Sequence, residues 1–188
     1  MNRHGRSEYL VLRRTIAARG ALRPILLVAG TGCWAGVLTA VLVWLPYPLA
    51  AAIPLLVLVA TFEAIRPLHF GAERIGRYLQ VFYEEAGDPE RLLRDTPSWE
   101  RVAMRLGTVP GVGGHPLFVP TFVLATAINY VAAYPWRATM IDSILTAALH
   151  AAFAGWLLAA HRAMTRQRAI ELERFRHLSR SGRDSPSL

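Results

Sequence analysis

The stretch ALRPILLVAGTGCWAGVLTAVLVWL, residues 21–45, decides how this chain folds. A helix needs about 20 mostly apolar residues to cross the ~30 Å hydrocarbon core of a bilayer, and this stretch is long enough. Further apolar runs follow at residues 47–65, 116–133 and 140–160. The sequence therefore predicts an all-α protein with a four-helix transmembrane bundle over residues 21–160.

The composition agrees with a membrane protein. The chain has 188 residues, 53% of them hydrophobic, and a mean hydropathy of +0.29. This length accommodates one bundle with short attachments and no separate catalytic domain. The run at 21–45 exceeds the apolar core of a signal peptide, so it is predicted to be a retained anchor. Cys33 is the single cysteine, which excludes a disulfide within the chain and predicts a packing role in the first span.

The distribution of charge predicts the topology. The net charge is +8, and all 21 basic residues are arginines. Residues 1–23 contain six arginines, residues 66–115 contain seven and residues 161–188 contain seven. The positive-inside rule places these three segments in the cytoplasm, so both termini lie inside and the two short connections outside. We therefore expect a multi-pass protein of a bacterial inner membrane.

The arginine-rich ends are predicted to be cytoplasmic attachments: a basic arm at residues 1–20 and a tail at 161–188 with a disordered end. Their arginines are attracted to anionic lipid headgroups by about 1 kcal/mol each near the surface. Neither end offers a folded basic face with interleaved aromatic residues, so nucleic acid is not an expected partner.

The connection at residues 68–114 is predicted to form an interfacial helical cap between the second and third spans. Residues 73–86 have the 3.6-residue pattern of an amphipathic helix, with Glu73, Arg77, Gln80 and Glu84 on the polar side. Two short helices are expected after Asp88 and Thr96. One apolar side, the predicted docking face, is expected to contact the membrane surface or a protein partner. It consists of Ile75, Tyr78, Leu79, Phe82 and Trp99.

Four polar residues inside the predicted spans are candidates for function. Asp142, Thr146 and His150 are spaced four residues apart, and Asn129 lies at a similar depth in the preceding span. Intramembrane polar groups are costly and mark either interhelical hydrogen bonds or an ion or proton path. Both alternatives remain open for the four residues, and Asp142 has a third: it faces water and caps its helix.

Three local patterns give further expectations. Glu63 and Arg66 have the spacing of an ion pair at the end of the second span. His69 and Glu73 have the spacing of two metal ligands but lack a third ligand, so they are predicted to be solvated and no metal is expected. Gly32 and Gly36 form a GxxxG step, which predicts close helix packing, either within the bundle or between two copies.

No phosphate loop, zinc motif or nucleophile elbow occurs in the sequence, and no cofactor is expected. We therefore predict a non-enzymatic accessory or scaffold protein of the membrane. The alternative is a small oligomeric channel or transporter whose path is formed by Asn129, Asp142, Thr146 and His150. A lipid-directed enzyme using His69, Glu73 and His115 is a third hypothesis, but these residues do not form a catalytic set.

Overall fold

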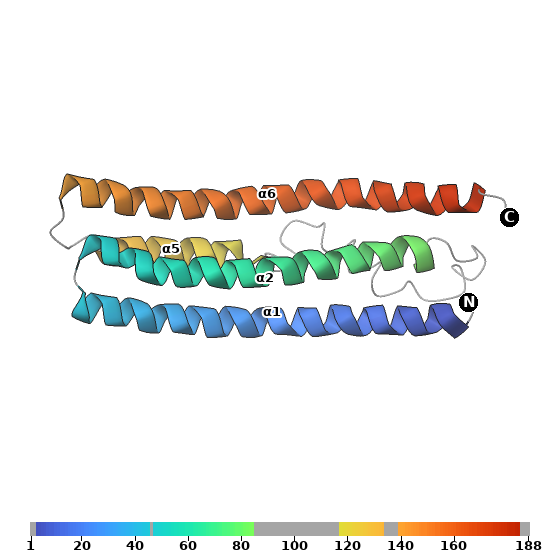
Figure 1. Cartoon of the computed structure of the whole chain (residues 1–188), viewed down its shortest axis with the longest axis horizontal. Coiled ribbons are helices and arrows are strands. Elements are labelled where there is room, and N and C mark those ends of the chain that lie inside the picture. Colours follow the sequence, from blue (N-terminus) through green and yellow to red (C-terminus); the bar gives the residue numbers. More distant parts are fainter. Residues whose placement is uncertain (1–2, 46, 85–116, 134–138, 185–188) are drawn as a thin grey trace. The chain divides into compact units, whose positions relative to one another are not determined.

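A computed structural model describes residues 3–45, 47–84, 117–133 and 139–184. These residues are helical apart from short connections, and no strand occurs among them. The long helices are α1 (Arg3–Trp44), α2 (Ala52–Leu79) and α6 (Met140–Asp184) (Figure 1). The short 3₁₀ helix η1 (Pro48–Ala51) precedes α2, and the π-helical turn η2 (Gln80–Glu84) follows it. The prediction of an all-α protein is therefore confirmed.

Three helical stretches are long and apolar enough to cross a membrane: Ser7–Trp44, Pro48–Tyr83 and Met140–Ser181. The predicted third span contains α5 (Val119–Ala133), an apolar helix of 15 residues. Its length falls short of the ~20 residues that a crossing usually needs, so a fourth span stays a prediction. The three long stretches are compatible with a multi-pass membrane protein.

The long helices continue well beyond the length of a span. The 42 residues of α1 and the 45 residues of α6 would measure about 63 Å and 68 Å, roughly twice the hydrocarbon core. Pro24 and Pro67 lie inside α1 and α2 without ending them. The predicted arm and tail are thus continuous with the apolar parts of α1 and α6, which run through residues 20 and 160 without a break.

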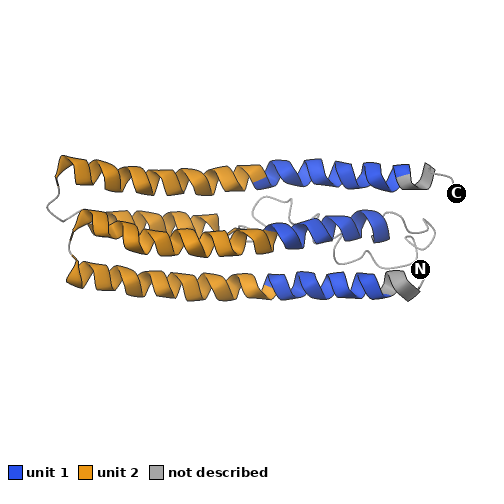
Figure 2. Ribbon diagram, in the orientation of Figure 1, with its two compact units in different colours: residues 1–20, 70–114, 164–188 blue, residues 21–69, 115–163 orange. Residues whose placement is uncertain are grey.

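The chain divides into two compact units, coloured in Figure 2. Unit 1 comprises Met1–Gly20, Phe70–Gly114 and Met164–Leu188, and unit 2 comprises Ala21–His69 and His115–Ala163. The predicted cap at 68–114 belongs to unit 1 from Phe70 onward, but its two short helices and Trp99 lie outside the described residues. Its first helix, predicted at 73–86, continues α2 as far as Leu79 and then becomes η2.

The core of unit 2 is formed by aromatic and branched side chains. The ring of Phe62 on α2 meets Phe122 of α5 and Phe153 of α6, with centroids 5.4 and 6.4 Å apart and nearly perpendicular planes. Such edge-to-face pairs add to the packing energy of the rings. On α1, Gly30 lies so close to α2 that a Cβ atom there would be 2.2 Å from Thr61 Cγ2. These contacts place segments of all four helices in one packed unit.

Candidate functional site

Two of the polar residues predicted within the spans, Asn129 and His150, lie in a buried cluster centred on Asn129 of α5, which is fully buried. Its amide nitrogen donates to the carbonyl oxygen of Ala51, 2.8 Å away, and lies 2.8 Å from His150 Nε2. Its Oδ1 accepts a hydrogen bond of 3.2 Å from Trp34 Nε1. The Asn129 cluster therefore joins α1, η1, α5 and α6 through one side chain.

The geometry fixes the tautomer of His150. Its Nδ1 lies 2.7 Å from the carbonyl oxygen of Thr146, which accepts only, so Nδ1 carries the proton. Nε2 is then the acceptor for the Asn129 amide. A second proton on His150 would place an Nε2–H group against the N–H of the Asn129 amide, so this hydrogen bond would be lost. The cluster thus holds a neutral imidazole, as expected for hydrogen bonds that join helices in a bilayer.

The structure brings together only part of the predicted group. His150 and Asn129 are hydrogen-bonded, whereas Thr146 contributes its carbonyl, and the buried Thr146 hydroxyl has no hydrogen-bond partner among the described residues. Asp142 is half-buried and bonds instead to Thr139, with Thr139 Oγ1 donating to Asp142 Oδ2 over 2.7 Å and accepting from the Asp142 backbone N–H over 3.2 Å. These reciprocal bonds form a capping box at the start of α6. The alternative that Asp142 caps its helix is confirmed, and it takes no part in the Asn129 cluster.

A second polar group, the Arg77 network, lies in unit 1. Arg77 of α2 is 5% exposed and pairs with Glu73 at 3.0 Å and with Glu171 of α6 at 2.6 Å. Arg74 also pairs with Glu171 at 2.8 Å, and Arg168 pairs with Glu73. Three arginines and two carboxylates therefore fasten α2 to α6 outside the apolar segments.

The electrostatics of Glu171 reflect this crowding. Burial raises the pKa of the carboxyl, but hydrogen bonds from Arg74, Gln167 and Arg77 outweigh burial and hold the pKa below its usual value. The charged form is therefore the one that the network stabilises. The sequence placed Glu73 and Arg77 on one side of a helix, but it did not predict that Glu171 of α6 would join them.

An aromatic cluster joins α1 to this network. Tyr78 and Tyr83 donate hydrogen bonds of 3.1 and 2.7 Å to the two carboxylate oxygens of Glu8 on α1. The rings of Tyr78 and Phe82 also meet Phe175 of α6, with centroids 6.1 and 6.4 Å away. Unit 1 is thus held together by contacts among α1, α2 with η2, and α6.

These contacts change the interpretation of the predicted docking face. Leu79 is fully buried, Ile75 is half-buried, and Tyr78 and Phe82 pack against α1 and α6. Long extensions of α1 and α6 cover the face, which the sequence could not show because their helical continuation was not expected. Arg77, predicted on the polar side, is buried for the same reason.

The remaining predicted residues have simple positions. Glu63 and Arg66 form the expected ion pair at 2.7 Å, and Trp156 of α6 donates to Glu63 over 2.8 Å. The prediction that His69 is solvated is wrong, because it is 3% exposed and lies 2.5 Å from Arg23 Nη1. No group of three potential metal ligands occurs among the described residues. His115 lies outside them.

The glycines of the GxxxG step do not pack within the described part of the chain. Gly32 and Gly36 are exposed, and a Cβ atom on either would meet nothing within 4 Å. The close approach is made by Gly30 instead. Packing of the step inside the bundle is therefore not observed, and self-association through it stays a prediction.

Searches against protein-family models, curated proteins and solved structures find no match for this chain. Its function is accordingly argued from the two polar groups and the surfaces around them.

Proposed function

We propose that this protein is a non-enzymatic scaffold of a bacterial inner membrane, with four spans and both termini in the cytoplasm. Its working part is unit 1, a platform of helices extended from the spans. Helices that continue beyond their membrane-spanning segments suit a protein that holds a partner near the membrane. The proposed orientation is supported by the arginine distribution and the positive-inside rule.

The observation that carries the proposal is the buried Arg77 between two carboxylates from two helices. A buried charge is costly unless its partners hold their geometry, so such a network favours one defined packing of α2 on α6. A channel or relay has less support, since the Asn129 cluster contains a neutral imidazole and Asp142 lies outside the cluster.

The surface proposed for the partner is a stripe on α6, formed by Arg166, Ile170, Arg174 and Leu178. All four residues are exposed and repeat at four-residue intervals, so they share one helix face. Ile170 and Leu178 are 55% and 57% exposed although they are large and apolar. Apolar anchors between arginines suit an amphipathic partner helix with acidic residues.

A photocrosslinking amino acid at Ile170, in living cells, tests this function. We expect a protein adduct of one dominant size, and we expect its loss in the double variant Arg166→Glu, Arg174→Glu. The matched control carries the same amino acid at Leu10 of α1, which is 50% exposed in the same unit. An Ile170 adduct unaffected by the charge reversal, or adducts with lipid alone, would contradict the proposal.

A further inference from the structure

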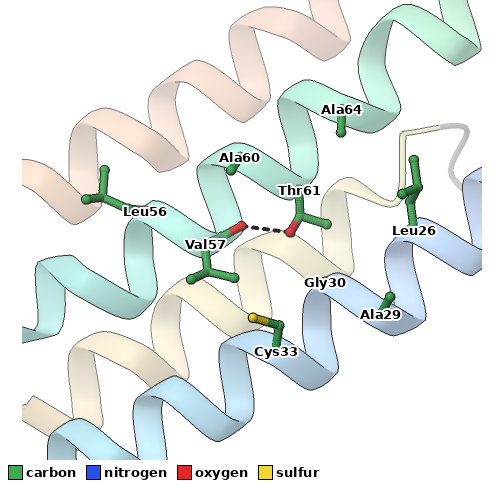
Figure 3. Close-up of a pocket in the computed structure, with 9 residues that line it drawn as sticks. All are labelled: Leu26, Ala29, Gly30, Cys33, Leu56, Val57, Ala60, Thr61 and Ala64. Carbon is green, nitrogen blue, oxygen red and sulfur yellow. Dashed lines mark hydrogen bonds between the residues drawn. The ribbon is translucent and has the colours of Figure 1, made fainter.

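An apolar groove between α1 and α2 has no role in the account so far. It has a volume of about 480 Å³ and is lined by Leu26, Ala29, Gly30 and Cys33 of α1 and by Leu56, Val57, Ala60, Thr61 and Ala64 of α2 (Figure 3). The volume lies within the range of ligand sites in proteins. All nine residues belong to unit 2 and to the segments predicted to lie in the bilayer.

Small residues create the groove. Ala60 and Ala64 are exposed along one wall, and Cys33 is exposed on the other. Gly30 brings the two helices together at the floor, where Thr61 turns its hydroxyl to the carbonyl oxygen of Val57 at 2.7 Å (Figure 3). The lining of the groove is therefore apolar, and its one hydroxyl, from Thr61, is already hydrogen-bonded to Val57. Such a surface suits a hydrocarbon chain.

A cation stands at one end of the groove. Arg23 precedes Leu26 by three residues and Gly30 by seven, so it lies on the same side of α1 one turn nearer the predicted cytoplasmic end. Its Nη1 atom contacts Nδ1 of His69 on α2, which bridges the same two helices. The guanidinium of Arg23 is a permanent cation.

We infer that the groove binds one anionic phospholipid, with an acyl chain between α1 and α2 and the headgroup phosphate at Arg23. The distances agree with this placement. Ten residues of helix separate Arg23 from Cys33, or about 15 Å, which is half the thickness of the hydrocarbon core. Arg23 would then lie at the level of the lipid headgroup. The groove would extend from there to the bilayer midplane, which is the length of an acyl chain in one leaflet.

Native mass spectrometry of the full chain in detergent tests the inference, with phosphatidylglycerol and phosphatidylcholine of identical acyl chains as probes. We expect a first bound lipid that favours phosphatidylglycerol about fivefold, the factor that one arginine contributes at an anionic surface. Arg23→Gln should remove the preference, whereas Arg162→Gln, at an exposed arginine of α6, should keep it. A preference that persists in Arg23→Gln would overturn the inference.

The groove itself is tested by filling it. Ala60→Leu with Ala64→Leu adds bulk at exposed positions and should abolish the first bound lipid of either type, while Ala151→Leu on α6 should not. A phosphatidylglycerol with a diazirine in mid-chain should crosslink to peptides containing Cys33 or Ala60 in the unaltered protein. Crosslinks spread evenly over all helices, or dimers that disappear on filling the groove, would show that lipid is not the occupant.

Discussion

The two units bury polar groups in different forms: unit 2 buries neutral groups and unit 1 buries a charged one. In unit 2, Asn129, Trp34 and His150 are neutral and share hydrogen bonds across four elements. In unit 1, Arg77 is almost as deeply buried but keeps its charge between Glu73 and Glu171. Uncompensated charge is costly in hydrocarbon, whereas water near unit 1 can solvate the edges of an ion network. In the proposed topology, this difference marks where the helices leave the bilayer.

Removing Arg77 should have the largest effect on this contrast. Arg77→Met removes the buried cation and leaves Glu73 and Glu171 paired with the exposed Arg168 and Arg74, and breaking a buried pair costs up to about 3–5 kcal/mol. We expect hydrogen exchange at residues 70–84 and 164–180 to accelerate strongly while the spans stay protected. Arg74→Met is the matched control: its side chain is 63% exposed, so the cost should stay within about 1 kcal/mol. Equal effects of the two variants would contradict the conclusion that the buried Arg77, and not the exposed Arg74, holds the network together.

Asn129→Leu should have the next largest effect and should act on unit 2. The variant removes three hydrogen bonds, each worth about 0.6–1.7 kcal/mol between helices in a membrane. We expect unfolding in dodecyl sulfate to begin at a lower detergent fraction. Thr39→Val serves as a control, because the Thr39 hydroxyl is exposed and bonds only within α1. A variant as stable as the control would show that Asn129 does not join the helices.

A pair of glycine substitutions compares two faces of α1. In Gly30→Leu the new side chain meets Thr61, and such overpacking typically costs about 1–3 kcal/mol. In Gly32→Leu the side chain enters open space, so the stability of the monomer should hardly change. Unfolding in dodecyl sulfate measures both. If Gly32→Leu instead dissociates a dimer in crosslinking assays, the predicted self-association through the GxxxG step is supported.

The smallest effect concerns the hydrogen bond from Tyr83 to Glu8 at the edge of unit 1. This bond raises the pKa of Tyr83 to about 12, whereas an isolated tyrosine ionises near 10. The stabilisation is complete below pH 10 and is lost as the pH rises towards 12, because only the protonated phenol donates. In Glu8→Gln, ultraviolet absorbance should show a phenol ionising nearer pH 10. An unchanged titration would show that Glu8 does not raise the pKa of Tyr83.

Much of this organisation could be read from the sequence, since long apolar runs and helical spacing depend on local order. The ion pair of Glu63 with Arg66 and the proximity of Asn129 to His150 follow from spacing and depth alone. The sequence could not show that Trp34 and Glu171 complete the two polar groups, because their partners lie over 90 positions away along the chain. The sequence also failed to predict that α1 and α6 continue past residues 20 and 160, where they cover the predicted docking face.

Labelling of single cysteines tests the central claim most directly. In a Cys33→Ser background, Leu178→Cys reports on unit 1, and Met140→Cys, at an 80% exposed residue, reports on the opposite end of α6. A membrane-impermeant maleimide should label Met140→Cys in spheroplasts and Leu178→Cys only in inverted vesicles. If Leu178→Cys reacts from the outside, or both positions react from one side, then α6 does not carry unit 1 into the cytoplasm.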